Sequence, residues 1–251
     1  GQEIGVGLGG PDLMVQRRAW SQTPPEFNED VLYIFNLEEL KYIKEEDGYI
    51  VIGSTTPVED LLYSDLAPNL LKEAIGIMAS PALRHMATIA GNIGNASPAG
   101  DTLPILYALD AIIVLQSVEG VRELPIDEVI TGPRRHVMNQ NEIIKEIKIP
   151  ICVFTDSVFE KVGGRQADAI SKVSFTGAIN IKDNKVLDFR IAFGAVSATI
   201  LRRKEIESKY IGLTKEELIG RVDDIVIDYD PFVRPIDDQR SNKEYRKTVA
   251  L

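Results

Sequence analysis

The sequence has very few residues that bind metals or form covalent links: one cysteine and two histidines among 251 residues. Cys152 alone cannot form an internal disulfide or hold an iron–sulfur cluster, because such clusters need several thiolates. His85 and His136 lie far apart without nearby cysteines, so no metal site is expected. There is also no G-x-S-x-G motif and no recognisable triad, so we predict no catalytic side chain. Redox chemistry would have to come from a bound organic cofactor or from a partner chain.

Long apolar runs and an excess of basic residues are also lacking. The longest apolar run, residues 108–115, is interrupted by Asp110 and is far shorter than the roughly 20 residues of a membrane span. The 38 acidic residues outnumber the 28 basic ones, which gives a net charge of −10. This balance argues against nucleic acid or an anionic membrane as a partner. Since no signal peptide is visible at the start, we expect a cytoplasmic protein.

The sequence does contain a segment of small and polar residues, 88–101, with three glycines, two asparagines, a serine and a threonine. Such a segment adds little apolar area to a core, and its glycines cost conformational entropy on folding. It suits a ligand better, because glycines let the backbone come close and its N–H groups can converge on an anion. With Asp101 as an acceptor for a hydroxyl, the segment predicts a pyrophosphate flanked by sugars. A polar loop without a ligand is the alternative.

The sequence of residues 88–104, TIAGNIGNASPAGDTLP, resembles a flavin-binding segment of the FAD subunits of the xanthine dehydrogenase and carbon monoxide dehydrogenase family. In that family the segment reads T-I-G-G-N-I-x-x-A-S-P-x-x-D. The matching residues are Thr88, Gly91, Asn92, Ala96, Ser97, Pro98 and Asp101. The resemblance implies that FAD is the cofactor and that the N–H groups of Gly91 and Asn92, helped by the Thr88 side chain, hold its pyrophosphate. It places Ser97 and Asp101 near the ribose or the adenosine.

The glycines at positions 5, 7 and 10 fit the dinucleotide pattern G-x-G-x-x-G, but this pattern has a mechanism only between a strand and a helix. Alternatively, Gly9-Gly10-Pro11-Asp12-Leu13 resembles the first FAD segment of the same family, A-G-G-T-D-L. Pro11 replaces the threonine, which removes one N–H and one hydroxyl that could bind phosphate. Ala90 stands where the second segment usually has another glycine, and it narrows the dihedral choices there.

Further residues match positions around the flavin ring in this family. Met78 stands at an aromatic position beside the flavin, and Val137 and Met138 match a leucine pair that packs on the ring; an exposed loop is the alternative for the pair. Lys161 matches a lysine that approaches the flavin, where a cation stabilises the reduced ring; a solvated lysine is the alternative. Arg84 is expected to have a structural or electrostatic role.

Apolar patterning predicts strands near residues 31–34, 49–53, 111–116, 141–150, 153–161, 171–181 and 187–194, and helices near 70–78 and 101–109 and after residues 199 and 214. Thr56 is expected to cap a further helix. Ser241 and Glu244 have the spacing of a capping box at the start of the last helix. Arg165 and Asp168 are three residues apart and are expected to pair.

The resemblance extends over essentially the whole chain and implies an α+β fold. Residues 1–150 would form a vanillyl-alcohol-oxidase-like (PCMH-type) FAD-binding domain. Residues 151–251 would form an α+β domain like the C-terminal domain of the CO dehydrogenase flavoprotein. Family members usually carry a small βα unit before the first FAD segment, and this unit is expected to be missing here.

The function implied is that of an FAD-binding electron-transfer subunit of a molybdopterin-dependent hydroxylase. Its partners would be a 2Fe-2S subunit, which delivers electrons, and a molybdopterin-binding subunit; NAD⁺ or another acceptor would take the electrons. Two alternatives remain open at this point. One is a non-catalytic assembly subunit with a degenerate FAD site, and the other is a stand-alone flavin oxidoreductase.

Overall fold

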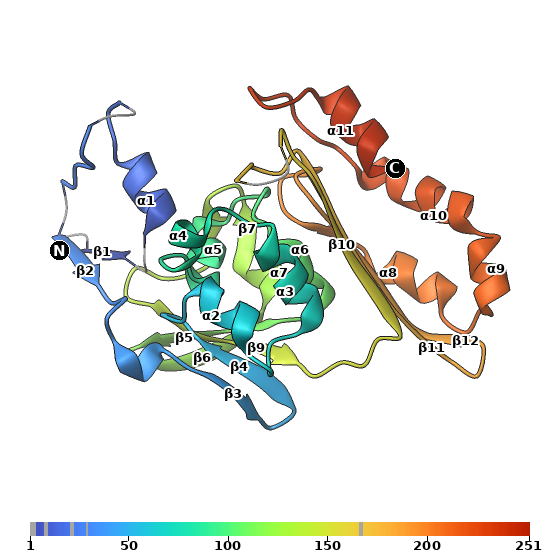
Figure 1. Ribbon diagram of the computed structural model, residues 1–251, viewed down its shortest axis with the longest axis horizontal. Helices are drawn as coiled ribbons and strands as arrows, with labels where there is room; N and C mark the ends of the chain where they lie inside the picture. Colours follow the sequence, from blue (N-terminus) through green and yellow to red (C-terminus); the bar gives the residue numbers. More distant parts are fainter. Residues whose placement is uncertain (1–3, 8–9, 21–22, 29, 166–167) are drawn as a thin grey trace.

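The computed structural model describes residues 4–7, 10–20, 23–28, 30–165 and 168–251. It shows a sheet with helices on one face and a second sheet whose outer face carries the C-terminal helices (Figure 1). Gly9, expected at the cofactor site, lies outside the described residues. Within these ranges, no helix is long and apolar enough to cross a membrane, and no group of three or more metal-ligating side chains is present.

The first sheet, as far as the chain is described, is antiparallel and consists in spatial order of β3 (Ile43–Glu46), β4 (Tyr49–Gly53), β9 (Ile143–Pro150), β5 (Ile112–Ser117) and β6 (Gly120–Pro125). The expected strand at 141–150 is the middle strand of this sheet. Its Ile147 lies opposite Ile52 on one side and Ile113 on the other. All three side chains are buried, because branched residues pack well on a pleated surface.

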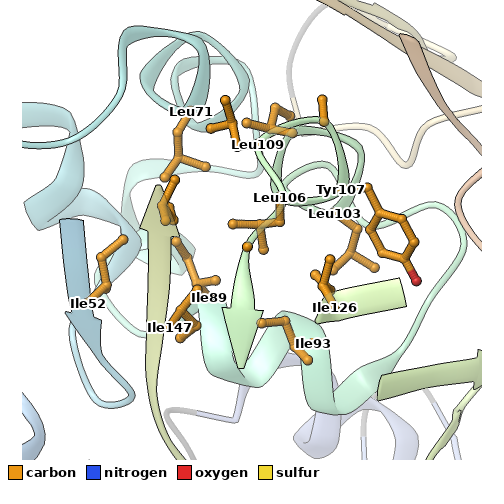
Figure 2. Packing of buried hydrophobic residues seen from close by; sticks show 14 of the residues in the cluster. Ile52, Leu71, Ile89, Ile93, Leu103, Leu106, Tyr107, Leu109, Ile126 and Ile147 are labelled. Atoms are coloured by element: carbon orange, nitrogen blue, oxygen red, sulfur yellow. The ribbon is translucent and has the colours of Figure 1, made fainter. Parts of the chain in front are cut away.

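Short helices cover one face of this sheet: α2 (Val58–Tyr63), α3 (Asn69–Gly76), α4 (Pro81–Arg84), α5 (Ile89–Asn95), α6 (Leu103–Ala108) and α7 (Ile126–Val129). Figure 2 shows how their apolar side chains meet the sheet. Ile89 and Ile93 lie one turn apart on α5 and therefore point to the same side. They pack with Leu71 of α3 and Leu106 of α6 in one buried cluster. This core fixes α5, which carries half of the segment predicted to bind a ligand.

The second sheet, in the described ranges, has the order β10 (Asp156–Val162), β11 (Val173–Lys182), β12 (Lys185–Gly194) and β13 (Leu201–Arg202), all antiparallel. The hairpin between β11 and β12 turns at Asp183 and Asn184, whose φ angles of 50° and 58° match the twist of the strands. Side chains alternate between the faces. Phe175 and Phe193 lie opposite each other with ring centroids 5.3 Å apart, on the outer face.

The outer face is covered by the C-terminal elements α8 (Lys204–Glu207), η2 (Ser208–Tyr210), α9 (Lys215–Ile219), α10 (Val222–Tyr229), η3 (Asp230–Phe232) and α11 (Lys243–Ala250). Tyr229 at the end of α10 packs edge-on against Phe193, with ring centroids 5.4 Å apart. These residues belong to a second buried cluster, between the sheet and the helices.

Two helix starts differ from the sequence expectation. Thr56 does not cap α2: its hydroxyl donates to Tyr42 O at 3.0 Å, and Pro57 occupies the N-cap position. Ser241 does not cap α11 either. The cap is Asn242, whose Oδ1 accepts a hydrogen bond from the N–H three residues later at 2.8 Å. The causes differ: at α11 the neighbouring Asn242 satisfies the helix end, whereas at α2 Pro57 makes no side-chain cap bond and the Thr56 hydroxyl is engaged with Tyr42 instead.

The inner face of the second sheet packs on α3 and α6 of the first half. Phe159, Ala178 and Ala192 of this face belong to the same buried cluster as the core of the first sheet. The division proposed at residues 150 and 151 therefore falls between β9 and β10, but the apolar core continues across it.

Two arginines of the second sheet fasten the end of α6. Arg190 Nη1 donates to Ala108 O at 2.8 Å, and Arg202 Nη1 donates to Tyr107 O and, at 2.9 Å, to Asp110 Oδ1. The last carbonyls of a helix lack partners inside the helix and carry partial negative charge, so cations there are stabilising. These bonds fix the orientation of the two halves beside the shared core.

The N-terminal region forms a small β–α–β unit from β1 (Ile4–Gly7), α1 (Pro11–Gln16) and β2 (Asp30–Tyr33), followed by η1 (Glu38–Leu40). The two strands are parallel. Gly5 and Gly7 thus lie in β1 and Gly10 at the N-cap of α1, so the glycine pattern does run from a strand into a helix. In the described part of the chain, however, β1 and β2 pair only with each other, whereas a Rossmann domain needs a larger parallel sheet.

Candidate functional site

The segment 88–101 begins as a helix rather than as an open loop. Thr88 is buried and caps α5: its Oγ1 accepts a hydrogen bond from Gly91 N at 2.9 Å. Asn92 N donates to Thr88 O at 3.0 Å. The N–H groups of Gly91 and Asn92 therefore already have partners in Thr88, and their contact with a pyrophosphate stays a prediction.

After α5 the chain turns back onto the helix. Ala96 takes the left-handed conformation at φ 46°, and the Ser97 hydroxyl accepts a hydrogen bond from the backbone N–H two residues later at 3.3 Å. Thr102 Oγ1 donates to Asn92 Oδ1 at 2.7 Å. Gly100 is required by this close approach, because a Cβ there would lie 2.9 Å from Asn92 Oδ1. Asn92 thus stabilises the turn, and Ser97 stays partly exposed.

Asp101 forms a buried polar contact between the two halves. Its Oδ2 lies 2.6 Å from Lys161 Nζ of β10, and its Oδ1 accepts a hydrogen bond from Ser171 Oγ at 2.6 Å. Both charged side chains are buried, with 5% of Lys161 and 10% of Asp101 exposed. Lys161 Nζ also lies 3.4 Å from Ile77 O. The structure therefore unites two predicted site residues in one ion pair, and Lys161 is neither solvated nor an uncompensated cation.

The first predicted segment lies against the second. Gly10 takes a left-handed conformation, with φ 77°, at the N-cap of α1. The first turn of α1 contains Pro11, Asp12 and Leu13. Pro11 is at the first helical position, where a backbone N–H would have no partner inside the helix. Gln16 Nε2 donates to Asn95 Oδ1 of α5 at 2.9 Å and to Asp12 Oδ2 at 3.1 Å. A side-chain hydrogen bond thus joins the two segments.

Apolar side chains with incomplete cover lie in the segments predicted to surround a ring. Met78 and Met138 are half-buried and pack against the edge of the first core. Ile77 and Val137 are 39% and 37% exposed. Ala90 behaves differently, because its side chain is fully buried in the core. Its methyl group is explained by packing, and any contact with a ligand would be through its backbone.

Val137 is held by an ion pair that the sequence did not reveal. Arg122 Nη2 of β6 donates to Val137 O at 2.9 Å, and Arg122 Nε lies 2.6 Å from Glu142 Oε1. Glu142 also accepts a hydrogen bond from Asn139 N at 2.7 Å. The hydrogen bonds from Arg122 are the main cause that lowers the pKa of Glu142 to about 2. The pair connects positions 122 and 142, and sequence spacing gives no signal for it.

Two backbone contacts with the segment 88–101 were also unexpected. Arg134 N, in the turn between β7 (Ile130–Gly132) and β8 (Arg135–His136), donates to Ala96 O at 3.0 Å. Ala195 N, just after β12, donates to Pro98 O at 2.8 Å. Backbone contacts of this kind carry no residue-type signal, so sequence reasoning could not find them.

Arg84 has the structural role that was expected. Its Nε lies 2.5 Å from Glu59 Oε2, and its Nη1 donates to Met78 O at 3.0 Å. The hydrogen bond from Arg84 lowers the pKa of Glu59. The expected pair of Arg165 and Asp168 is also present, with 3.5 Å between Nη2 and Oδ2 on the surface.

Comparison with known proteins assigns this arrangement to a family. Residues 6–152 match the model of the FAD binding domain in molybdopterin dehydrogenase, and residues 158–251 match the CO dehydrogenase flavoprotein C-terminal domain. The chain belongs to this family of flavoprotein oxidoreductases, and FAD is its cofactor. The predicted family, the α+β fold with these two domain types, and the predicted cofactor are confirmed.

Individual relatives agree with the family. The glyceraldehyde dehydrogenase medium chain of Sulfolobus acidocaldarius is 31% identical over 88% of this chain and 78% of its own length. The carbon monoxide dehydrogenase medium chain of Hydrogenophaga pseudoflava is 29% identical over the same shares. A solved structure of carbon monoxide dehydrogenase from the latter organism aligns with a TM-score of 0.88 at 26% identity, over 100% of this chain and 86% of that chain.

The residues present fit FAD. Partly exposed apolar side chains at Ile77 and Val137 offer surface for an apolar ring. Ser97 offers a partly exposed hydroxyl in the second segment. The bond from Gln16 to Asn95 brings the two FAD-binding segments of the family together.

Proposed function

We propose that this chain is the FAD-binding electron-transfer subunit of a molybdopterin-dependent hydroxylase. The observation that carries the proposal is the meeting of the two family segments, since Gln16 at the end of α1, the helix that begins in the first segment, shares a hydrogen bond of 2.9 Å with Asn95 of the second. FAD, when bound, supplies a carrier that accepts electrons singly and releases them as a pair. The names of the relatives, medium chains of dehydrogenases, support a multi-subunit assembly.

In this proposal the partners are a 2Fe-2S subunit, which delivers the electrons, and a molybdopterin-binding subunit, which oxidises the substrate. The single cysteine of these 251 residues supports the placement of the clusters on another chain. NAD⁺ or another acceptor takes the electrons from this chain. The division into domains 1–150 and 151–251 and the cytoplasmic location also remain proposals.

The chain's own residues would bind and orient the cofactor. Met78, Val137 and Met138 would contact the ring as apolar walls, and Gly10 and the first turn of α1 would approach the phosphates. Ser97 would donate to the sugar side. The Asp101–Lys161 pair, at the end of the same segment, would keep the second half of the molecule closed against this site.

The test is a visible absorption spectrum of the purified protein, with the released cofactor identified by chromatography. We expect flavin absorption and stoichiometric FAD. Absence of flavin after incubation with excess FAD would contradict the proposal and favour an assembly subunit. If the isolated chain oxidised a purine or an aldehyde by itself, a stand-alone oxidoreductase would replace the electron-transfer subunit.

A further inference from the structure

A buried arginine in the last helix has no role in the site described so far. Arg246 of α11 is only 2% exposed. Its Nη1 donates to two backbone carbonyls, Lys172 O at 2.7 Å and Ala195 O at 3.3 Å. Its Nη2 donates to Asp238 Oδ1 at 2.8 Å. One guanidinium thus joins three separate stretches of the second half.

Both carbonyls belong to stretches that contact the flavin segment 88–101. Ser171, next to Lys172, donates its hydroxyl hydrogen bond to Asp101 Oδ1 at 2.6 Å. Ala195 donates its own N–H to Pro98 O at 2.8 Å. Arg246 therefore binds the backbone of two stretches from which, in the described part of the chain, the second half donates uncharged hydrogen bonds to this segment.

The stretch around Ala195 needs such support. Ala195 has a φ of 61°, a left-handed conformation that is strained for a residue with a Cβ. The preceding Gly194 approaches its surroundings so closely that a Cβ would lie 2.3 Å from Ser174 Oγ and 3.3 Å from Pro98 O. A strained backbone persists only where its surroundings overdetermine it. The bonds to Pro98 O and from Arg246 fulfil this condition.

Asp238 fixes the orientation of the guanidinium. Its carboxylate accepts hydrogen bonds from the Arg240 backbone N–H at 2.8 Å, the Arg240 guanidinium at 2.7 Å and the Ser241 N–H at 3.2 Å. Because a charge-assisted bond to a fixed carboxylate is directional, Arg246 is held with its other edge toward the two carbonyls.

From these contacts we infer that Arg246 is a positioning residue of the flavin site, acting through Ser171 and Ala195 on Asp101 and Pro98. The inference rests on the proposed function and adds a residue to its site. A substitution that removes the hydrogen bonds of Arg246 releases the stretches around Ser171 and Ala195. The turn that contains Ser97 can then move. Since that turn belongs to the flavin segment, the affinity for FAD falls although Arg246 is remote from the cofactor.

The experiment compares FAD binding by the wild type, Arg246→Lys, Arg246→Met and a control on the same helix, Lys247→Met. Lys247 is half-exposed and pairs with Asp230 at 2.9 Å, so the control also removes one charge and one ion pair. Dissociation constants are measured by flavin fluorescence titration, and the visible flavin band is recorded for each variant. We expect Arg246→Met to weaken binding about tenfold, within the 5- to 150-fold range of coupled sites, with Arg246→Lys between it and the wild type and Lys247→Met unchanged.

A double-mutant cycle keeps the inference testable if Arg246→Met folds poorly. Ser171→Ala removes one of the two contacts that Arg246 supports, so Arg246→Lys should weaken FAD binding less in the Ser171→Ala background than in the wild type. Strictly additive effects, or a lower melting temperature with unchanged dissociation constants and an unchanged flavin band, would overturn the inference. A wild type without FAD affinity would overturn the proposed function as well.

Discussion

Gln16 and Asn95 lie 79 positions apart in the sequence, yet the Gln16 side-chain amide donates to Asn95 Oδ1 at 2.9 Å. The bond joins α1, which follows the first glycine-rich stretch, to the last residue of α5, which carries the second. Each helix is short, so neither can set the spacing of the two segments by itself. This side-chain contact therefore contributes to the spacing of the proposed cofactor site.

We predict that Gln16→Ala weakens FAD binding with little change in melting temperature. The bond is exposed, and a hydrogen bond of this kind contributes about 0.5–1.5 kcal/mol, equivalent to about two- to tenfold in the dissociation constant. Fluorescence titration with FAD measures the effect. Gln140→Ala, at an exposed position outside α1 and α5, is the control and should bind like the wild type; equal losses in both variants would contradict a specific contact.

Lys161→Met should destabilise the protein without any cofactor present. Removing one partner of a buried ion pair leaves an uncompensated charge and costs about 3–5 kcal/mol. Among the side chains that the structure describes, Asp101 would then keep Ser171 as its donor. Denaturant unfolding of the cofactor-free protein gives the free energy. The double variant Lys161→Met/Asp101→Asn should recover part of the loss. Lys209→Met breaks the more exposed pair with Asp228 and should cost less than about 1 kcal/mol.

Stability should fall in acid partly through Glu142. Hydrogen bonds from Arg122 lower the pKa of Glu142 from 4.5 to about 2. A lowered pKa in the folded state means that the ionised form stabilises the fold above pH 4.5 and that this contribution is lost as the pH falls from 4.5 toward 2. Glu142→Gln should show a smaller decline over this range in denaturant unfolding. Parallel curves for the variant and the wild type would refute the assignment.

Two glycines of the flavin segment should respond to alanine in opposite directions. Gly94→Ala places a Cβ where no atom lies within 4 Å, inside α5, and should stabilise the fold by about 0.5–1 kcal/mol. Gly100→Ala places a Cβ 2.9 Å from Asn92 Oδ1 and should cost about 1–3 kcal/mol. Thermal unfolding of both variants measures the direction and size of each change in stability. Similar shifts in the same direction would show that the turn after α5 adjusts freely.

The family and most strands and helices could be predicted well from the sequence. Apolar periodicity indicates which residues are buried, and the ordered motif matches indicate where the backbone comes close to a ligand. The sequence predicted a binding loop at residues 88–101, whereas residues 89–95 form α5. Small residues hide the helical pattern, since Ile89 and Ile93 are the only large apolar residues that mark its buried face. The core under those two isoleucines overrides the weak helix propensity of the glycines and asparagines.

The sequence predicted which residues belong to the candidate site, but it did not predict which of them contact each other. Lys161 and Asp101 were both expected near FAD, but their ion pair joins β10 to the end of another segment 60 positions earlier. A single sequence records which charges are present, and the packing of α6 against β11 and β12 decides which of them meet. The same holds for Arg246, because its acceptors include two backbone carbonyls, which no residue type in the sequence marks.

The apolar core that runs from the first sheet through α3 and α6 to the inner face of β10–β12 makes the two matched domains a single thermodynamic unit. A chain cut after Pro150 would leave both sides of that contact open to water, with Phe159, Ala178 and Ala192 on one of them. Heat or denaturant should therefore melt both halves in one cooperative step. A mutation deep in the second half will reach the flavin segment through shared stability as well as through direct contact.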